Sequence, residues 1–223
     1  TKEESDLSVA EPLTATPRPL PFFAMHYLNL LKRQITIGNG KKVEKVITTI
    51  DYDTQVLLEK MMEEHSSRLK ESLVFNMAGI IMDVKTEEII AYVGNTGFFS
   101  ANGKSVFVDM VHAKRSSGSL LKPFLYAGML DRGMIFPKSL LKDIPFQIQG
   151  YAPQNNSGEY QGVVRADEDL SQSLNTPYVR SLREYGISPF LKLLKECGFS
   201  TFTRSAEEYG LPLILGGGEL TLY

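Results

Sequence analysis

The stretch Arg115-Ser-Ser-Gly-Ser119-Leu-Leu-Lys122-Pro-Phe124 places a serine and a lysine three residues apart, with a glycine directly before the serine. In the first turn of a helix, this spacing puts both side chains on one face, so the amine of Lys122 can touch the hydroxyl of Ser119. Gly118 has no Cβ, and a neighbouring backbone can therefore come close to the serine. The stretch predicts a serine nucleophile with a lysine base at the start of a helix.

The pattern Ser-x-x-Lys also occurs at two other places in the chain. Ser67-Arg-Leu-Lys70 lies in a run of charged residues and is typical of the solvated face of a helix. Ser139-Leu-Leu-Lys142 follows a proline and is expected to cap a short helix. Neither copy has a glycine before its serine, so we expect the chemistry at Ser119.

A second polar element follows a loop that contains Tyr151-Ala-Pro-Gln-Asn155. It is Leu170-Ser-Gln-Ser173-Leu-Asn175-Thr-Pro177, in which a serine and an asparagine stand two residues apart before a proline. Such residues also cap helices, which is the alternative role for this pair. An earlier Ser100-Ala-Asn102 has the same spacing but precedes the nucleophile and lies in a polar loop.

These segments resemble a known family. Arg-x-x-Gly-Ser-x-x-Lys-Pro-Phe is similar to the active-site segment of the class A, bifunctional penicillin-binding transpeptidases, and Lys122-Pro-Phe-Leu-Tyr126 most resembles the 1C branch. Ser173-x-Asn175 resembles the second motif of the family in spacing and context. The resemblance covers residues 22–223. It implies the α/β (α+β) fold of penicillin-binding transpeptidases and serine β-lactamases, a mainly antiparallel sheet flanked by helices, here incomplete at the C-terminus.

The resemblance also implies roles for four residues. Ser119 would attack the peptide bond between two terminal D-alanines, and Lys122 would accept its proton. Ser173 would relay a proton between the lysine and the leaving amine, and Asn175 would bind the lysine or the substrate amide. Burial beside apolar neighbours is expected to lower the pKa of the lysine below the value of about 10.4 for a free side chain.

The implied function is that of a peptidoglycan D,D-transpeptidase, with stem peptides ending in D-Ala-D-Ala and β-lactam antibiotics as partners at Ser119. The resemblance also implies an N-terminal glycosyltransferase module and a periplasmic location, with the membrane anchor outside residues 1–223. It implies no cofactor and no metal. A formal net charge of −2 gives no reason to expect a nucleic-acid partner. The alternative is a non-catalytic cell-wall binding or scaffold domain derived from a transpeptidase.

The third motif of the family, Lys-Thr-Gly, has no match in the sequence. Lys85-Thr-Glu87 precedes the nucleophile and lacks the glycine. The segment from Leu215 to Tyr223 resembles the family segment upstream of that motif. We therefore expect the sequence to stop inside its domain, with the missing C-terminal part as a partner of the site. Without the oxyanion donor and carboxylate site that this part supplies in the family, weak labelling by a fluorescent penicillin is expected.

The sequence predicts a proline-rich linker over residues 1–24 and the N-terminal part of the transpeptidase domain over 25–223. A short helix is expected from Phe22 to about Arg33, and a β-branched strand over residues 45–50. Asp51 is expected to cap a helix that runs to about Lys70.

Two apolar runs, Met77 to Asp83 and Glu88 to Gly94, predict a β-hairpin. Similar segments form the first strand pair of the family, which usually has a glycine where this chain has Glu87. The dense apolar pattern from Gly118 to about Asp131 predicts a helix buried on most sides. The single cysteine, Cys197, stands at the apolar end of a helix and is expected to be a small buried side chain.

Overall fold

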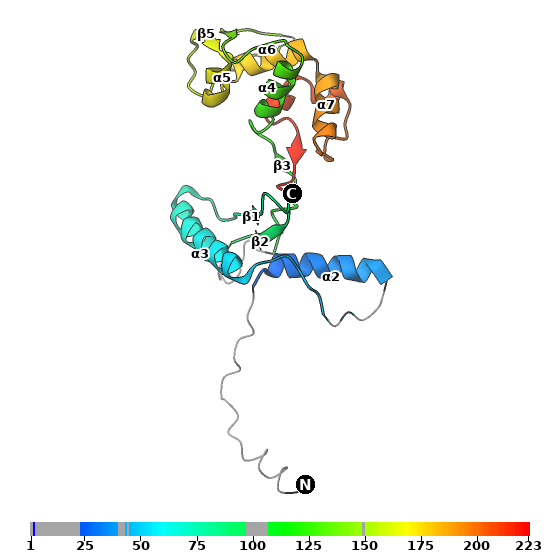
Figure 1. Ribbon diagram of the computed structural model, residues 1–223. Coiled ribbons are helices and arrows are strands. Elements are labelled where there is room, and N and C mark those ends of the chain that lie inside the picture. The colour runs from blue at the N-terminus through cyan, green and yellow to red at the C-terminus, as the bar shows by residue number, and fades with distance from the viewer. Residues whose placement is uncertain (1, 3–22, 40–42, 44, 97–106, 149) are drawn as a thin grey trace. The chain divides into compact units, whose positions relative to one another are not determined.

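The computed structural model describes residues 2, 23–39, 43, 45–96, 107–148 and 150–223, and the chain divides into two compact units, residues 1–107 and 108–223. The expected linker over residues 1–24 lies almost entirely outside the described residues. Helices and pairs of antiparallel strands form both units (Figure 1). This combination confirms the predicted α/β class.

The first unit contains two long helices and a β-hairpin: α2 (Met25–Asn39), α3 (Tyr52–Leu69) followed by the short 3₁₀ turn η1 (Lys70–Ser72), and the strands β1 (Gly79–Met82) and β2 (Ile89–Val93). Asp51 caps α3 as predicted, because its carboxylate accepts the backbone N–H of Thr54 at 2.8 Å. Helix α2 extends beyond the predicted end at Arg33.

The outer edge of β2 is bonded by Asp51, the N-cap residue of α3, and by Gln55 near the start of that helix. The buried amide of Gln55 accepts the backbone N–H of Tyr92 at 2.7 Å and donates to its carbonyl oxygen at 3.0 Å. Asp51 N–H donates to the carbonyl oxygen of Ile90 at 2.9 Å. These bonds satisfy the β2 edge without a third strand, so the strand predicted over residues 45–50 is wrong.

The hairpin is confirmed, with β1 and β2 antiparallel and Gly79 paired with Val93. Its turn is held by the carboxylate of Asp83, which accepts the backbone N–H groups of Lys85 and Thr86 at 2.8 and 2.9 Å. Glu87 adopts a φ of +58°, a conformation that glycine takes without steric cost. Glu87 therefore adopts a conformation that is uncommon for a residue other than glycine.

The second unit is mainly helical and carries two short strand pairs. In chain order it contains β3 (Arg115–Ser116), α4 (Lys122–Asp131), β4 (Leu140–Asp143), β5 (Gly162–Arg165), α5 (Ala166–Gln172), α6 (Thr176–Tyr185), α7 (Ile187–Glu196), α8 (Ala206–Tyr209), η2 (Leu211–Leu215) and β6 (Glu219–Leu220). Strand β3 pairs with β6 and β4 pairs with β5, both antiparallel.

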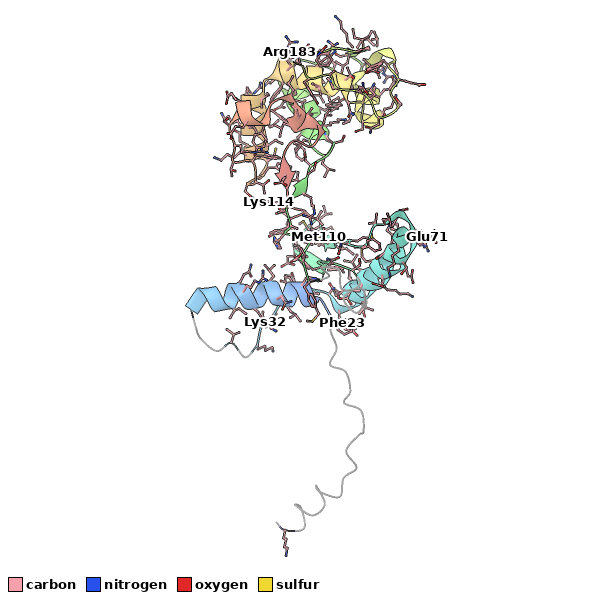
Figure 2. The ribbon with its side chains drawn as sticks, turned by 180° about the vertical axis from the view of Figure 1, so that it is seen from behind. Phe23, Lys32, Glu71, Met110, Lys114 and Arg183 are labelled. Carbon is pink, nitrogen blue, oxygen red and sulfur yellow. The ribbon has the colours of Figure 1, made fainter. Side chains whose placement is uncertain are left out.

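Helix α4 packs in the core of this unit against α6 and α7. Within α4 only Pro123, Ala127 and Asp131 are exposed, which confirms the prediction of a helix buried on most sides. Gly128 allows the close packing, because a Cβ there would lie 2.6 Å from the side chain of Leu193. The opposite, solvent-facing side of α6 carries Arg183, whose side chain points outward (Figure 2).

Two predictions for this unit are wrong. Ser139 does not cap a short helix: its hydroxyl accepts the backbone N–H of Phe136 at 2.8 Å, and the chain continues into strand β4. Cys197 is exposed, because α7 buries Phe190 and Leu194 and the cysteine is the C-cap residue, where the chain turns away. Within the described parts of the chain, no helix is both long and apolar enough to cross a membrane.

Candidate active site

Ser119 lies in a run of turns directly before α4, not inside the helix as the sequence predicted. The helix begins at Lys122, with Pro123 in its first turn, where a missing N–H costs nothing. Backbone bonds link Leu120 N–H to the Ser117 carbonyl oxygen and Lys122 N–H to the Ser119 carbonyl oxygen, at 3.0 and 3.1 Å. Side chains three residues apart are aligned in such 3₁₀-type turns, yet Lys122 is buried. Ser119 is exposed.

A second segment approaches the nucleophile from the C-terminal part of the chain. Ser116 Oγ donates to the carbonyl oxygen of Gly216 at 2.8 Å, and Ser117 N–H donates to that of Gly218 at 3.0 Å. A Cβ on Gly216 would lie 2.9 Å from the backbone nitrogen of Gly118. The close backbone approach predicted for this site therefore exists, but the glycine that permits it is Gly216. Gly118 is needed for its φ of +52°.

The amine of Lys122 is buried and fully hydrogen-bonded. The side chain is 1% exposed, and Nζ donates to the Ser173 carbonyl oxygen at 2.8 Å, to Ser173 Oγ at 3.2 Å and to Asn175 Oδ1 at 2.9 Å. An ammonium group has three N–H donors, and each finds one of these acceptors. The structure thus brings together three of the four predicted site residues through direct contacts. Among the described residues, no hydrogen bond involves the hydroxyl of Ser119, so the predicted contact between this hydroxyl and the amine of Lys122 is not present.

Burial lowers the pKa of Lys122 from 10.5 to about 8, because the ammonium form loses its hydration. The carboxylate of Asp169 acts in the opposite direction by favouring the charged amine. The direction of the shift confirms the prediction from the apolar neighbours. At a pKa of about 8, about a tenth of the amine is neutral at pH 7 and can accept a proton, far more than for a free lysine.

Ser173 reaches the lysine because of an uncommon backbone conformation. It is the C-cap residue of α5 and has a φ of +54°, in the left-handed region that few residues other than glycine adopt. This conformation turns both its carbonyl oxygen and its hydroxyl toward Lys122 Nζ. Strained non-glycine residues of this kind cluster at functional sites.

Asn175 occupies the N-cap position of α6 but does not cap the helix with its own side chain. The capping acceptor is Asn155 Oδ1, which receives the backbone N–H groups of Asn175 and Thr176 at 2.9 and 3.2 Å. The side chain of Asn175 is therefore available for Lys122. The helix-capping role that the sequence left open for Asn175 belongs to Asn155 instead.

A buried acid beside the lysine was missed by the sequence reasoning. Asp169 is 0% exposed, and neither of its carboxyl oxygens has a hydrogen-bond partner among the described residues. Burial raises the pKa of Asp169 to about 7, the charge of Lys122 opposes this shift, and Asp143 adds to it. The ring of Tyr178 lies 5.4 Å from Lys122 Nζ. The sequence signal was weak: Asp169 stands four residues before Ser173, a spacing that brings two side chains to one side only if the segment is helical.

The sequence offered two other candidate pairs. Ser67 and Lys70 are exposed at the end of α3, and Ser100 and Asn102 lie outside the described residues.

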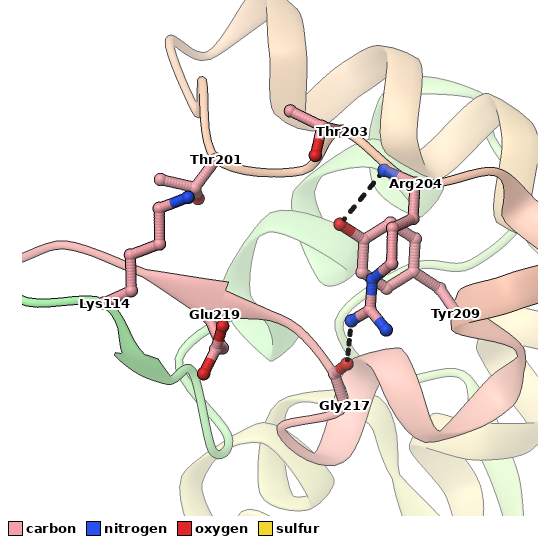
Figure 3. A pocket seen from close by; sticks show the side chains of 7 residues that line it. All are labelled: Lys114, Thr201, Thr203, Arg204, Tyr209, Gly217 and Glu219. Atoms are coloured by element: carbon pink, nitrogen blue, oxygen red, sulfur yellow. Dashed lines mark hydrogen bonds between the residues drawn. The ribbon is translucent and has the colours of Figure 1, made fainter.

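A hollow of about 520 Å³ lies elsewhere in this unit. Figure 3 shows the residues that line it: Lys114, Thr201, Thr203, Arg204, Tyr209, Gly217 and Glu219. Its charged side chains have both signs and are exposed. It contains none of the four predicted residues, so we assign no chemistry to it.

Comparisons with known proteins identify the family of this chain. The family model described as the penicillin-binding protein transpeptidase domain matches residues 77–212. Penicillin-binding protein 1C of Escherichia coli is 33% identical over 99% of this chain, and penicillin-binding protein 1A of the same organism is 30% identical over 50% of it. The chain spans 28% of the length of the former and 13% of the latter.

Two solved structures share the fold. Penicillin-binding protein 1A from Haemophilus influenzae superposes with a TM-score of 0.67 and 19% identity, covering 99% of this chain and 48% of that one. PonA1 from Mycobacterium tuberculosis, in complex with penicillin V, superposes with a TM-score of 0.63 and 23% identity, covering 89% of this chain and 53% of that one. The fold, the matched segment and the identity over nearly the whole chain lead to one conclusion. This chain belongs to the class A penicillin-binding proteins and carries sequence of their transpeptidase domain.

Proposed function

We propose that this chain provides the nucleophile and the base of a peptidoglycan D,D-transpeptidase that acts through a serine acyl-enzyme. The observation that carries the proposal is the buried amine of Lys122, held by Ser173 and Asn175 and linked by one backbone turn to the exposed Ser119. A buried lysine of lowered pKa next to a serine is a suitable base for nucleophilic catalysis.

In the proposed acylation step, Ser119 Oγ attacks the carbonyl carbon between two terminal D-alanines. The hydroxyl proton passes to the neutral amine of Lys122 as the O–C bond forms. The C–N bond then breaks, and the terminal D-alanine leaves after its nitrogen receives a proton through the hydroxyl of Ser173. Ser173 suits this relay because its Oγ lies 3.2 Å from Lys122 Nζ.

In the second step, the amine of a neighbouring stem peptide attacks the ester carbon. A new C–N bond forms, the bond to Ser119 Oγ breaks, and the proton lost by the amine returns to the serine. Because Lys122 cycles between its neutral and charged forms, a pKa near the working pH serves both steps. Asn175 keeps the amine in place in both forms.

The family supports the proposed partners and location. β-Lactams should acylate Ser119, since the relatives are named for binding penicillin and one solved relative holds penicillin V. Peptidoglycan lies outside the cytoplasm, so we place the site at the periplasmic face of the inner membrane. The full-length protein is also proposed to carry a glycosyltransferase module and the remaining part of the transpeptidase domain, which would supply the third motif.

The test is turnover by the full-length protein of a peptide that ends in D-Ala-D-Ala, with an amine acceptor present. Release of D-alanine and formation of the transfer product are expected, with a loss of about 10³-fold or more in Ser119→Ala. Ser139→Ala removes the serine of the other Ser-Leu-Leu-Lys copy and serves as the matched control, with activity retained. Equal release by Ser119→Ala and the unchanged protein would support the non-catalytic scaffold alternative or another nucleophile.

A further inference from the structure

Asn155 lies in the loop between β4 and β5, far in sequence from the residues whose positions it fixes. Its side chain is buried, with 4% of the residue exposed. Oδ1 accepts the first two N–H groups of the α6 segment, from Asn175 and Thr176. The first N–H groups of a helix have no partner within the helix, and an N-cap side chain normally supplies one. Here a residue from another loop takes that role.

The same loop fixes the orientation of the Asn175 amide. Asn175 Nδ2 donates to the carbonyl oxygen of Gln154 at 2.8 Å, while Oδ1 accepts from Lys122 Nζ at 2.9 Å. A carbonyl oxygen can only accept and an ammonium group can only donate. The amide of Asn175 therefore has one satisfied orientation, with its oxygen on the lysine.

Asp143, at the end of β4, fixes Asn155 in turn. It is 0% exposed, and its Oδ1 accepts from Asn155 Nδ2 at 2.8 Å. Its Oδ2 accepts the backbone N–H of Gln161 at 2.9 Å. Asn155 Nδ2 donates also to the carbonyl oxygen of Glu159, at 2.9 Å. Every polar atom of the Asn155 side chain thus has a partner that only one orientation of its amide can satisfy.

We propose that Asp143 and Asn155 are positioning residues of the active site, which take over the cap of α6 and thereby hold the amide oxygen of Asn175 on the amine of Lys122. This inference rests on the proposed function of Lys122 as the base. The inference adds two residues to the active site, neither of which contacts the nucleophile. The connection runs from β4 through the loop to α6 and then to α4, entirely within the second unit.

Exchange of the two side chains tests the proposal. Asn155→Asp places a second carboxylate next to that of Asp143. The donor between the two side chains is lost, so these carboxylates cannot hydrogen-bond to each other. Asp143→Asn alone loses one of the two bonds, because Asn155 and Gln161 donate to different carboxylate oxygens and the NH₂ group that replaces one of these oxygens cannot accept. In the double variant, the amide introduced at position 143 can donate to the carboxylate introduced at position 155 and accept from Gln161. That carboxylate can still accept the two helix N–H groups, and only the bond to Glu159 is then lost.

The measurement is acylation of the full-length protein by a penicillin, with the limiting rate and the half-saturating concentration determined separately for folded protein. Asn155→Asp is expected to lower the limiting rate about 10²-fold, because small displacements of catalytic groups have effects of that size. The half-saturating concentration should change little. The double variant should recover to within about threefold of the unchanged protein. Arg183→Ala, on the exposed side of α6, is the control and should keep the full rate.

Four outcomes decide between the possibilities. If Asn155→Asp, folded, acylates as fast as the unchanged protein, the proposal is overturned. If the double variant stays as slow as Asn155→Asp, pairing between residues 143 and 155 does not position the site. Should Asn155→Asp fail to fold, a drop of about tenfold in the milder Asp143→Asn supports the proposal and an unchanged rate contradicts it. Absence of acylation in the unchanged protein would instead refute the proposed function.

Discussion

The amine of Lys122 donates to both the carbonyl oxygen and the hydroxyl of Ser173, at 2.8 and 3.2 Å. The two residues lie on different helical segments, and the left-handed conformation of Ser173 lets both of its oxygens face the same nitrogen. The carbonyl contact holds the lysine, and the hydroxyl contact offers a path for its proton. These two functions can be separated by mutation.

Ser173→Ala should lower acylation by a penicillin by about 10² to 10⁴-fold, the usual range for loss of a group that transfers protons. The lysine should stay in place, because its bonds to the Ser173 carbonyl and Asn175 remain. Stopped-flow acylation kinetics measure the rate, and the melting temperature of the variant should change little. An acylation rate equal to that of the unchanged protein would exclude a proton relay through this hydroxyl.

The acylation rate should rise with pH, with a midpoint near 8, because only the neutral amine of Lys122 accepts a proton. Asp169→Asn removes the carboxylate that favours the charged amine, so the midpoint should move to lower pH. Lys122 and Asp169 influence each other's titration, so the midpoint reflects both groups. Acylation rates between pH 5 and 10 check this prediction, and a midpoint that moves upward in Asp169→Asn contradicts it.

The stability of the fold should also depend on Asp169. Its pKa is raised from 3.8 to about 7, so the folded protein binds more protons than the unfolded chain between these values. Stability should therefore fall as the pH rises from about 4 to about 7, to the extent set by this one group. The variant Asp169→Asn should lack this pH-dependent contribution to stability, because its side chain does not titrate. Urea unfolding at several pH values measures it, and identical pH dependences for the two proteins would show that Asp169 is not buried as described.

Gly216→Ala should destabilise the protein by about 2 kcal/mol or more through strain and overlap. The new Cβ would lie 2.5 Å from Ser116 Oγ and 2.9 Å from Gly118 N, at a φ of +107°. Gly133→Ala is the matched control. The φ of Gly133 is +65°, but no atom lies within 4 Å of the new Cβ, so the loss of stability should be smaller. Denaturant unfolding gives both values, and equal losses would show that the contact with the nucleophile segment is unimportant.

Local signals predicted the elements whose stabilising contacts are local. The Asp51 cap and the hairpin after Met77 follow from capping chemistry and strand pattern, and the structure has both. The run over residues 45–50 has equally strong β propensity. It forms no strand because a side chain, Gln55, satisfies the edge that a strand would have used.

The residues that touch Lys122 directly were found in the sequence because they stand in compact motifs. Asp169, Asp143 and Asn155 could not be assigned a role in this way. Each acts across a distance in sequence that only the packing of α4, α5 and α6 closes. A buried carboxyl group without a hydrogen-bond partner becomes visible only when its surroundings are known.

The most direct test of the account is identification of the residue that carries the covalent adduct after the full-length protein is incubated with a penicillin. Peptide mapping by mass spectrometry should locate the acyl group on Ser119, in the peptide that also contains Lys122, at one adduct per chain. Ser119→Ala should abolish the adduct, and Ser139→Ala should keep it. An adduct on any other serine, or none on the folded protein, would contradict the assignment of Ser119 as the nucleophile.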